Sequence, residues 1–281
     1  MSNWPLHDGA RYESFGKVTS GGSNGTVVSA SASANTKGAW TQLIASTGFA
    51  YVGFQLFANT DTNGEDFLID IAIGAAASEK IVADNIFSGT YRAHAAVMLQ
   101  IPVGIPVGSR ISARVQSNVG SATCVISGIG YAVGFASPLI GPHSRMISMG
   151  ESTTVTTGTD VQAGTSANTK GAWIQLSAST EADFAALVVS VGSNKNTTPA
   201  IAHFLLDIGV GAAGSEKVIV PNFCITTRYV AFETVSTILE PAQGPFACSV
   251  PAGSRLAMRS QSTTNDPTDR IVDAVLYGIA A

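Results

Sequence analysis

The sequence predicts an all-β protein of two tandem antiparallel β-sandwich domains, jelly-roll-like in type, related by an internal duplication. The octapeptide SANTKGAW runs from Ser33 to Trp40 and recurs from Ser166 to Trp173, an offset of 133 residues, close to the size of one ordinary domain. Apolar and polar residues alternate with a period of two, and Gly, Asn, Asp and Pro separate the alternating segments. No segment shows the longer period and the end signals of a helix.

The repeat covers most of the chain. FLIDIAIGAA, starting at Phe67, matches FLLDIGVGAA, starting at Phe204, at an offset of 137 residues. PVGSR at Pro106 matches PAGSR at Pro251 at an offset of 145 residues, so the second copy carries small insertions, as surface loops tolerate. The expected organisation is an N-terminal leader at 1–16, a first β-sandwich at 17–136, a linker at 137–149 and a second β-sandwich at 150–281.

About eight short strands are expected in each copy. In the first copy the segments with strand character are 26–31, 40–45, 51–58, 67–73, 80–83, 95–101, 110–116 and 123–133. Gly- and Pro-containing turns lie between them. Eight strands in about 130 residues fit an antiparallel sandwich.

The composition narrows the class of function. Charged residues make up 12% of the chain, against about 25% in a typical soluble domain, so part of the surface is expected to lie against other subunits. The formal net charge of −4 argues against nucleic-acid binding, which needs a basic face. No apolar run reaches the roughly 18 residues of a membrane helix, and the first residues lack the pattern of a signal peptide.

Motifs for a cofactor, a metal or a nucleophile are not found. The sequence contains no HExxH, no pair of CxxC motifs and no GxxxxGK[ST]. Cys124, Cys224 and Cys248 do not align between the copies and are expected to be small buried apolar side chains, with no disulfide or metal framework. We therefore expect no cofactor and no enzymatic activity.

Asp70 and Asp207 lie at matching positions inside apolar strands. A carboxylate there could act in catalysis, bind a cation or pair with an arginine on a neighbouring strand. One acid per domain lacks the second carboxylate of a glycosidase pair, so a structural ion pair is favoured. The candidate partners recur on one face of a predicted strand, as Arg110 and Arg114 in copy one and Arg255 and Arg259 in copy two.

Trp40 and Trp173 follow the repeated Lys-Gly-Ala turn. They could be platforms on which a sugar stacks, but core anchors at the start of a strand are the favoured interpretation. Lys37 and Lys170 in that turn are interpreted as solvated. The GAAxSE segments are interpreted as tight connections whose small residues could allow close approach by another subunit.

The repeated string SANTKGAW…LIDIAIGAAASEKI…PVGSRISARVQ resembles a β-sandwich module of virion proteins of tailed bacteriophages, found in tail, baseplate, neck or fibre components. The resemblance covers nearly all of both copies. It implies a structural role in the virion and carries over no catalytic residues.

Two functions follow as expectations. The first is a non-enzymatic virion component that forms an oligomer in the tail, the neck or collar, or the baseplate, after assembly in the host cytoplasm. Its expected partners are other copies of itself and other virion proteins, with no nucleic acid and no membrane insertion. The alternative is a carbohydrate-binding protein for receptor recognition or capsid decoration, which adds a host-surface glycan to the partners.

Overall fold

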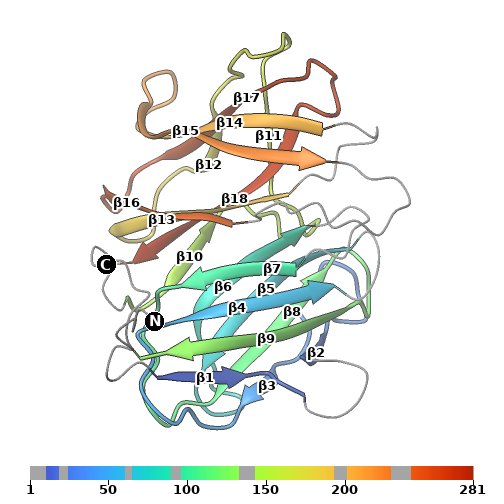
Figure 1. Cartoon of the computed structure of the whole chain (residues 1–281), viewed down its shortest axis with the longest axis vertical. Coiled ribbons are helices and arrows are strands. Elements are labelled where there is room, and N and C mark those ends of the chain that lie inside the picture. Colours follow the sequence, from blue (N-terminus) through green and yellow to red (C-terminus); the bar gives the residue numbers. More distant parts are fainter. Residues whose placement is uncertain are drawn as a thin grey trace, which may run out of the picture.

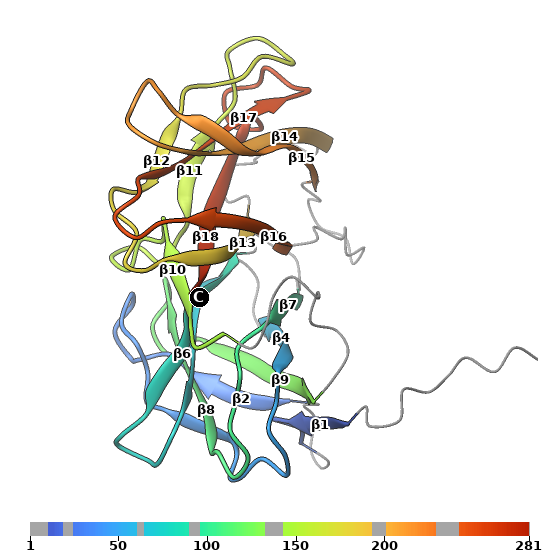
Figure 2. The same ribbon diagram turned by 90° about the vertical axis from the view of Figure 1, so that its left-hand side faces the viewer.

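The computed structural model describes residues 11–18, 25–60, 65–89, 96–132, 143–192, 201–228 and 242–280. These residues form eighteen β-strands and no helix, arranged as two sandwiches along the long axis of the molecule (Figures 1 and 2). Accordingly, the described part offers no helix that is long and apolar enough to span a bilayer. The prediction of two tandem antiparallel β-sandwiches is confirmed.

Each copy of the repeat supplies nine strands. The first copy has β1 (Tyr12–Phe15), β2 (Thr26–Ser29), β3 (Thr41–Ile44), β4 (Gly53–Thr60), β5 (Asp66–Ile73), β6 (Lys80–Gly89), β7 (Ala96–Ile101), β8 (Ile111–Ser117) and β9 (Thr123–Tyr131). The second has β10 (Met146–Met149), β11 (Thr159–Gln162), β12 (Ile174–Ser177), β13 (Phe184–Gly192), β14 (Ile201–Val210), β15 (Lys217–Arg228), β16 (Ala242–Val250), β17 (Leu256–Ser262) and β18 (Ile271–Ala280).

Both copies have the strand order of a jelly roll. In copy one, β2 pairs with β9 in the sheet β9-β4-β7, and this sheet faces the sheet β3-β8-β5-β6. In copy two, β11 pairs with β18, which continues to β13 and β16, and the facing sheet is β12-β17-β14-β15. The alternating burial of β9 shows why its sequence, TCVISGIGY, forms a strand with one face toward the core.

Two short strands lie outside the segments expected to be sheet. β1 falls in the range expected as a leader, and β10 falls in the range expected as a linker. They occupy equivalent places, because β1 pairs with β9 and β10 pairs with β18, the ninth strand of each copy. Each copy therefore has one strand more than the eight expected.

Strand β10 joins the two sandwiches. It pairs antiparallel with β18 of its own copy and parallel with β6 of the first copy, where Met146 lies opposite Ala83. One continuous sheet, β16-β13-β18-β10-β6-β5-β8-β3, therefore runs through both copies (Figure 2). The two copies are fused into one body along the edge of β6.

The apolar interior of copy one extends into copy two. The buried cluster of the first sandwich includes Val275, Tyr277 and Ile279 of β18, whereas Leu276 on the same strand belongs to the cluster of the second sandwich. Successive side chains of a strand point to opposite faces, so β18 serves both interiors. The outer face of the β13–β18 sheet is thus part of the first core.

The cysteines match their expected role only in part. Cys124 is buried, Cys248 is half-buried and Cys224 is exposed, and all three are free thiols. The expectation that all three are buried is wrong for Cys224. Its equivalent in copy one is Phe87, which is buried where β6 meets the second copy, whereas β15 is the outermost strand of its sheet among the described residues.

Candidate functional site

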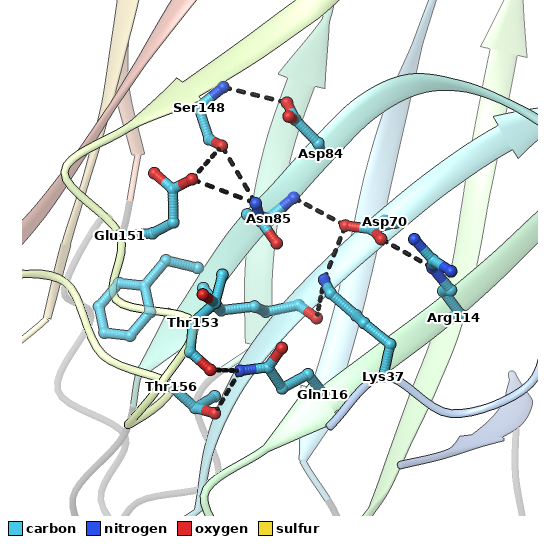
Figure 3. A network of polar contacts seen from close by, with 12 residues as sticks. Lys37, Asp70, Asp84, Asn85, Arg114, Gln116, Ser148, Glu151, Thr153 and Thr156 are labelled. Atoms are coloured by element: carbon cyan, nitrogen blue, oxygen red, sulfur yellow. Dashed lines mark hydrogen bonds and ion pairs between the residues drawn. The ribbon is translucent and has the colours of Figure 1, made fainter. Parts of the chain in front are cut away.

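A buried aspartate forms the centre of a polar cluster on the outer face of copy one. Asp70 of β5 is 2% exposed. Its Oδ1 accepts hydrogen bonds from Lys37 Nζ at 2.7 Å and from the Asn85 N–H at 2.9 Å, and its Oδ2 accepts one from Arg114 Nε at 2.8 Å (Figure 3). The Lys37 ammonium also donates to the Leu68 carbonyl oxygen at 3.1 Å. Both carboxylate oxygens are therefore occupied by donors from the protein.

Copy two contains the same cluster. Asp207 of β14 accepts hydrogen bonds from Lys170 Nζ at 3.0 Å, from the Asn222 N–H at 2.8 Å and from Arg259 Nε at 2.9 Å. Lys170 also donates to the Leu205 carbonyl oxygen at 3.0 Å. Because every contact recurs, the cluster belongs to the architecture of each sandwich.

The interpretation of Lys37 and Lys170 as solvated is wrong. Both side chains reach the aspartate of their own copy, and neither is fully exposed. Burial lowers the pKa of Lys37, and the neighbouring Asp70 carboxylate opposes that shift. For Asp207, burial favours a higher pKa, but the Asn222 N–H, Lys170 and Arg259 together outweigh it and hold the pKa below its usual value.

The two arginines of each repeated strand have different partners. Arg114 and Arg259 pair with the central aspartate. Arg110 instead binds Glu79 at 3.0 Å, together with the Gln42 side chain and the Gly74 carbonyl oxygen. In the same way, Arg255 of copy two binds Glu216, Gln175 and the Gly211 carbonyl oxygen. The GAAxSE segment is thus a tight turn that an arginine holds against the adjacent strand.

Trp40 and Trp173 are half-buried, so the interpretation as core anchors is wrong. The guanidinium carbon of Arg114 lies 4.5 Å from the ring centroid of Trp40, and that of Arg259 lies 4.5 Å from the ring centroid of Trp173. A guanidinium over an indole face contributes about 0.5–2 kcal/mol, depending on how far the pair is shielded from water. Each tryptophan therefore orients the arginine that binds the aspartate.

The octapeptide repeats because most of its residues have a structural role. Asn35 has a positive φ of 56°, and Asn168 has the same conformation with a φ of 60°. A Cβ on Gly38 would overlap the Ser29 carbonyl oxygen, so no larger residue fits there without a backbone shift. The lysine and the tryptophan complete the cluster. The sequence could have revealed the lysine's role, since it recurs at the same offset as the rest of the motif.

In copy one the cluster lies beside the contact with copy two. The Asn85 side-chain amide donates to Ser148 Oγ at 3.4 Å and to Glu151 Oε1 at 3.1 Å. The Gln116 amide donates to the Thr153 carbonyl oxygen and to Thr156 Oγ1 (Figure 3). The cluster thus positions side chains that hold the segment following β10.

Asp84 of β6 contributes a carboxylate to this contact. Its carboxylate accepts a hydrogen bond from the Ser148 N–H at 3.0 Å and pairs with Arg145 at 3.3 Å. Burial raises the pKa of Asp84, while the Ser148 N–H and Arg145 oppose that shift. We call the contact built by β6, β10 and β18 the intrachain joint.

The chemistry open to the clusters is limited by their hydrogen bonding. Each central carboxylate is almost fully buried, and both of its oxygens accept hydrogen bonds from fixed donors of the protein, so it is poorly placed to bind a ligand. Within the residues that the structure describes, no group of three or more His, Cys, Asp or Glu side chains could hold a metal ion. The clusters serve to fix a loop, a bulged strand and the edge of a sheet.

No family model matches the chain, and no curated protein matches it. Among solved structures, it is similar to the N-terminal tandem CBM22 domain of Xyn10C from Paenibacillus barcinonensis, with 9% identity and a TM-score of 0.26 over 96% of this chain and 92% of that one. It is also similar to the VP2 subviral particle of infectious bursal disease virus, with 12% identity and a TM-score of 0.17 over 97% of this chain and 76% of that one. Scores this low carry no inference about ligands or activity.

Fold and clusters together define a class: an all-β protein whose two sandwiches share a duplicated ionic cluster and one continuous sheet.

Proposed function

We propose that this chain is a non-enzymatic structural component of a tailed-bacteriophage virion, forming an oligomer in the tail, the neck or collar, or the baseplate. One observation carries the proposal. The charged side chains that the duplication retains in the two clusters bind each other or the backbone, so they stabilise the fold. A protein whose repeated ionic clusters serve its architecture is suited to assembly. The low content of charged residues supports the same role.

The duplication also supports an assembly role. Two copies of one sandwich in one chain give two similar surfaces, and such surfaces suit contacts with several neighbours in a ring or a stacked layer. The outer surfaces have diverged while the clusters have not. Cys224, for example, is exposed where Phe87 is buried. Different neighbours for the two sandwiches account for that divergence.

The proposal is tested on particles purified from the source of this sequence. Mass spectrometry of the particles should detect the chain at a fixed copy number, and cryo-electron microscopy should place its two sandwiches in a symmetric layer. Particles that lack the chain, together with a purified protein that binds no other particle protein, would overturn the proposal.

The alternative proposal is recognition of a glycan. It is favoured by the partial exposure of Trp40 and Trp173, because aromatic faces often bind sugars. It is opposed by the guanidinium that lies over each ring. A glycan that quenches or shifts the tryptophan fluorescence of the wild type, but not that of Trp40→Ala and Trp173→Ala together, would favour it. An array without binding would count against it.

A further inference from the structure

The intrachain joint has a donor side and a receptor side. The donor side is the outer face of the β10–β18 sheet, where Met146 and Tyr277 are both fully buried. The receptor side is the edge strand β6 of copy one. The Tyr277 hydroxyl accepts a hydrogen bond from the Phe87 N–H at 2.7 Å and donates one to the Asn85 carbonyl oxygen at 3.3 Å.

No described segment pairs with a second receptor side, which lies on copy two. Strand β15 corresponds to β6, and it is the edge of its sheet among the described residues. Cys224 replaces the buried Phe87 and is exposed. Asn222 and Gln261 take the places of Asn85 and Gln116, the two amides that hold copy two in the joint. In the described part of the chain, neither side-chain amide has a hydrogen-bond partner.

A second donor side, on copy one, is likewise left unpaired by the part of the chain that the structure describes. Strand β1 corresponds to β10, and within the described ranges it pairs with β9 alone. Tyr12, which corresponds to the buried Met146, is 56% exposed. Ile129, which corresponds to the buried Tyr277, is 36% exposed. The pairing registers fix these correspondences, because Ile129 lies opposite Ser14 as Tyr277 lies opposite Ser148.

The exposed face around β1 has the character of an interface. Side chains that lie directly opposite each other in paired strands share a face, which places Val27 beside Val125, and Ser127 beside Phe57. No charged side chain stands at these positions, and Val27 is 48% exposed. Lys17, opposite Gly25, is the charged residue nearest to them. A face with several exposed apolar side chains and few charges is characteristic of a protein contact.

We propose that a second copy of this chain docks its β1 face on the β15 edge of the first, repeating the intrachain joint between chains. The inference deepens the proposed structural role and rests on it. β1 and β15 lie toward opposite ends of the long axis (Figure 1), so each chain would offer one donor and one receptor. Such a head-to-tail contact closes into a ring or continues as a filament, depending on the rotation between successive chains.

The joint between chains is weaker than the one within a chain. In copy one, Asp84 binds Arg145 and the Ser148 N–H, but the equivalent residue of copy two is Pro221, which has no carboxylate. A proline also cannot donate a backbone hydrogen bond to an added strand. Arg11 and Ser14 keep the places of Arg145 and Ser148. The contact therefore rests on side-chain packing, while the joint within the chain also has the advantage of covalent linkage.

Sedimentation equilibrium of the full chain under reducing conditions tests the proposal. The wild type should gain mass with concentration. Tyr12→Asp removes the donor and Cys224→Asp removes the receptor, and each should lower the association constant by about tenfold or more, as loss of a central interface contact does. Val107→Asp, at a 63% exposed position outside both surfaces, should match the wild type.

Mixing the two variants identifies the geometry. An equimolar mixture of Tyr12→Asp and Cys224→Asp should form dimers and nothing larger, because only one intact donor and one intact receptor remain to meet. A wild type that stays monomeric up to its solubility limit overturns the proposal. So does a Cys224→Asp protein that associates like the wild type, since that result indicates a symmetric contact between two β1 faces.

A gain of affinity tests the alignment of the two joints. Pro221→Asp restores the partner of Arg11 and should tighten association by about tenfold, the effect of roughly 1.4 kcal/mol. No change or weaker association contradicts the alignment. These results are separate from the virion role. If the chain assembles head to tail but is missing from particles, only the proposed virion role is refuted. If the chain is a particle component but its mixed variants form no dimer, only the head-to-tail contact is refuted.

Discussion

Replacing Asp207 by asparagine should strongly destabilise the second sandwich, although the two side chains have nearly the same shape. The amide of the Asp207→Asn variant would keep the shape of the side chain but leave Lys170 and Arg259 without the carboxylate that they contact at 3.0 and 2.9 Å. Removing one member of a fully buried ion pair costs about 3–5 kcal/mol. Lys170 and Arg259 remain 21% and 31% exposed, so water relieves part of that cost. We expect a loss of about 2–3 kcal/mol.

The assay is urea unfolding at pH 7, followed by circular dichroism and by tryptophan fluorescence. The matched control is Glu181→Gln, which also turns a carboxylate into an amide but at an ion pair where Glu181 is 65% exposed. That control should change the unfolding free energy by less than about 0.5 kcal/mol. If Asp207→Asn falls within the same limit, the cluster does not hold the sandwich and the reasoning fails.

The pH dependence gives the prediction a second test. The pKa of Asp207 is lower in the folded chain than in the unfolded one, so its stabilisation is fully present above the unfolded pKa of about 3.9. The stabilisation is lost as the pH falls through the folded pKa. The difference between wild type and Asp207→Asn should therefore be constant from pH 7 to about pH 5 and should shrink below about pH 4. A difference that grows on acidification would contradict the assignment.

Three further predictions concern single positions. Gly171→Ala should cost about 2 kcal/mol or more in urea unfolding, because its Cβ would overlap the Gln162 carbonyl oxygen. Tyr277→Phe should cost about 1–3 kcal/mol, because it leaves a buried N–H of β6 without its acceptor, and hydrogen exchange should rise at that amide. Burial raises the pKa of Cys124 to about 12, so a thiol reagent should modify the exposed Cys224 first and Cys124 only after unfolding.

The sequence was informative wherever structure depends on short-range pattern or on the repeat. The alternation in Arg110–Gln116 predicted β8, which the structure places at Ile111–Ser117, and the matching segments at Phe67 and Phe204 predicted β5 and β14. The repeat also pointed to the two aspartates as structural centres. A carboxylate inside an apolar strand needs a partner, and an arginine on a neighbouring predicted strand was within reach of sheet geometry.

The parts that the sequence did not reveal depend on contacts between distant segments. Strand β10 has only four residues. One of its two edges pairs with β6, which lies in the other copy and far away in the sequence. Lys37 lies 33 residues from Asp70, in a turn where lysines are usually solvated. The arginine that covers each tryptophan is the same residue that binds the aspartate, and it lies far from the tryptophan in the sequence. No local sequence pattern distinguishes a tryptophan covered by an arginine from one buried in the core.

The sharing of β18 between the two interiors has a consequence for how the chain is made. Tyr277 and its neighbours complete the core of the first sandwich, yet Ile271, where β18 begins, is translated 140 residues after Tyr131 ends β9. At about 5–20 residues per second, a ribosome needs roughly 7–28 s for that stretch. During that interval the first sandwich has all nine of its own strands and an uncovered apolar edge at β6. A nascent chain stalled between the two copies should therefore bind chaperones that the finished chain does not.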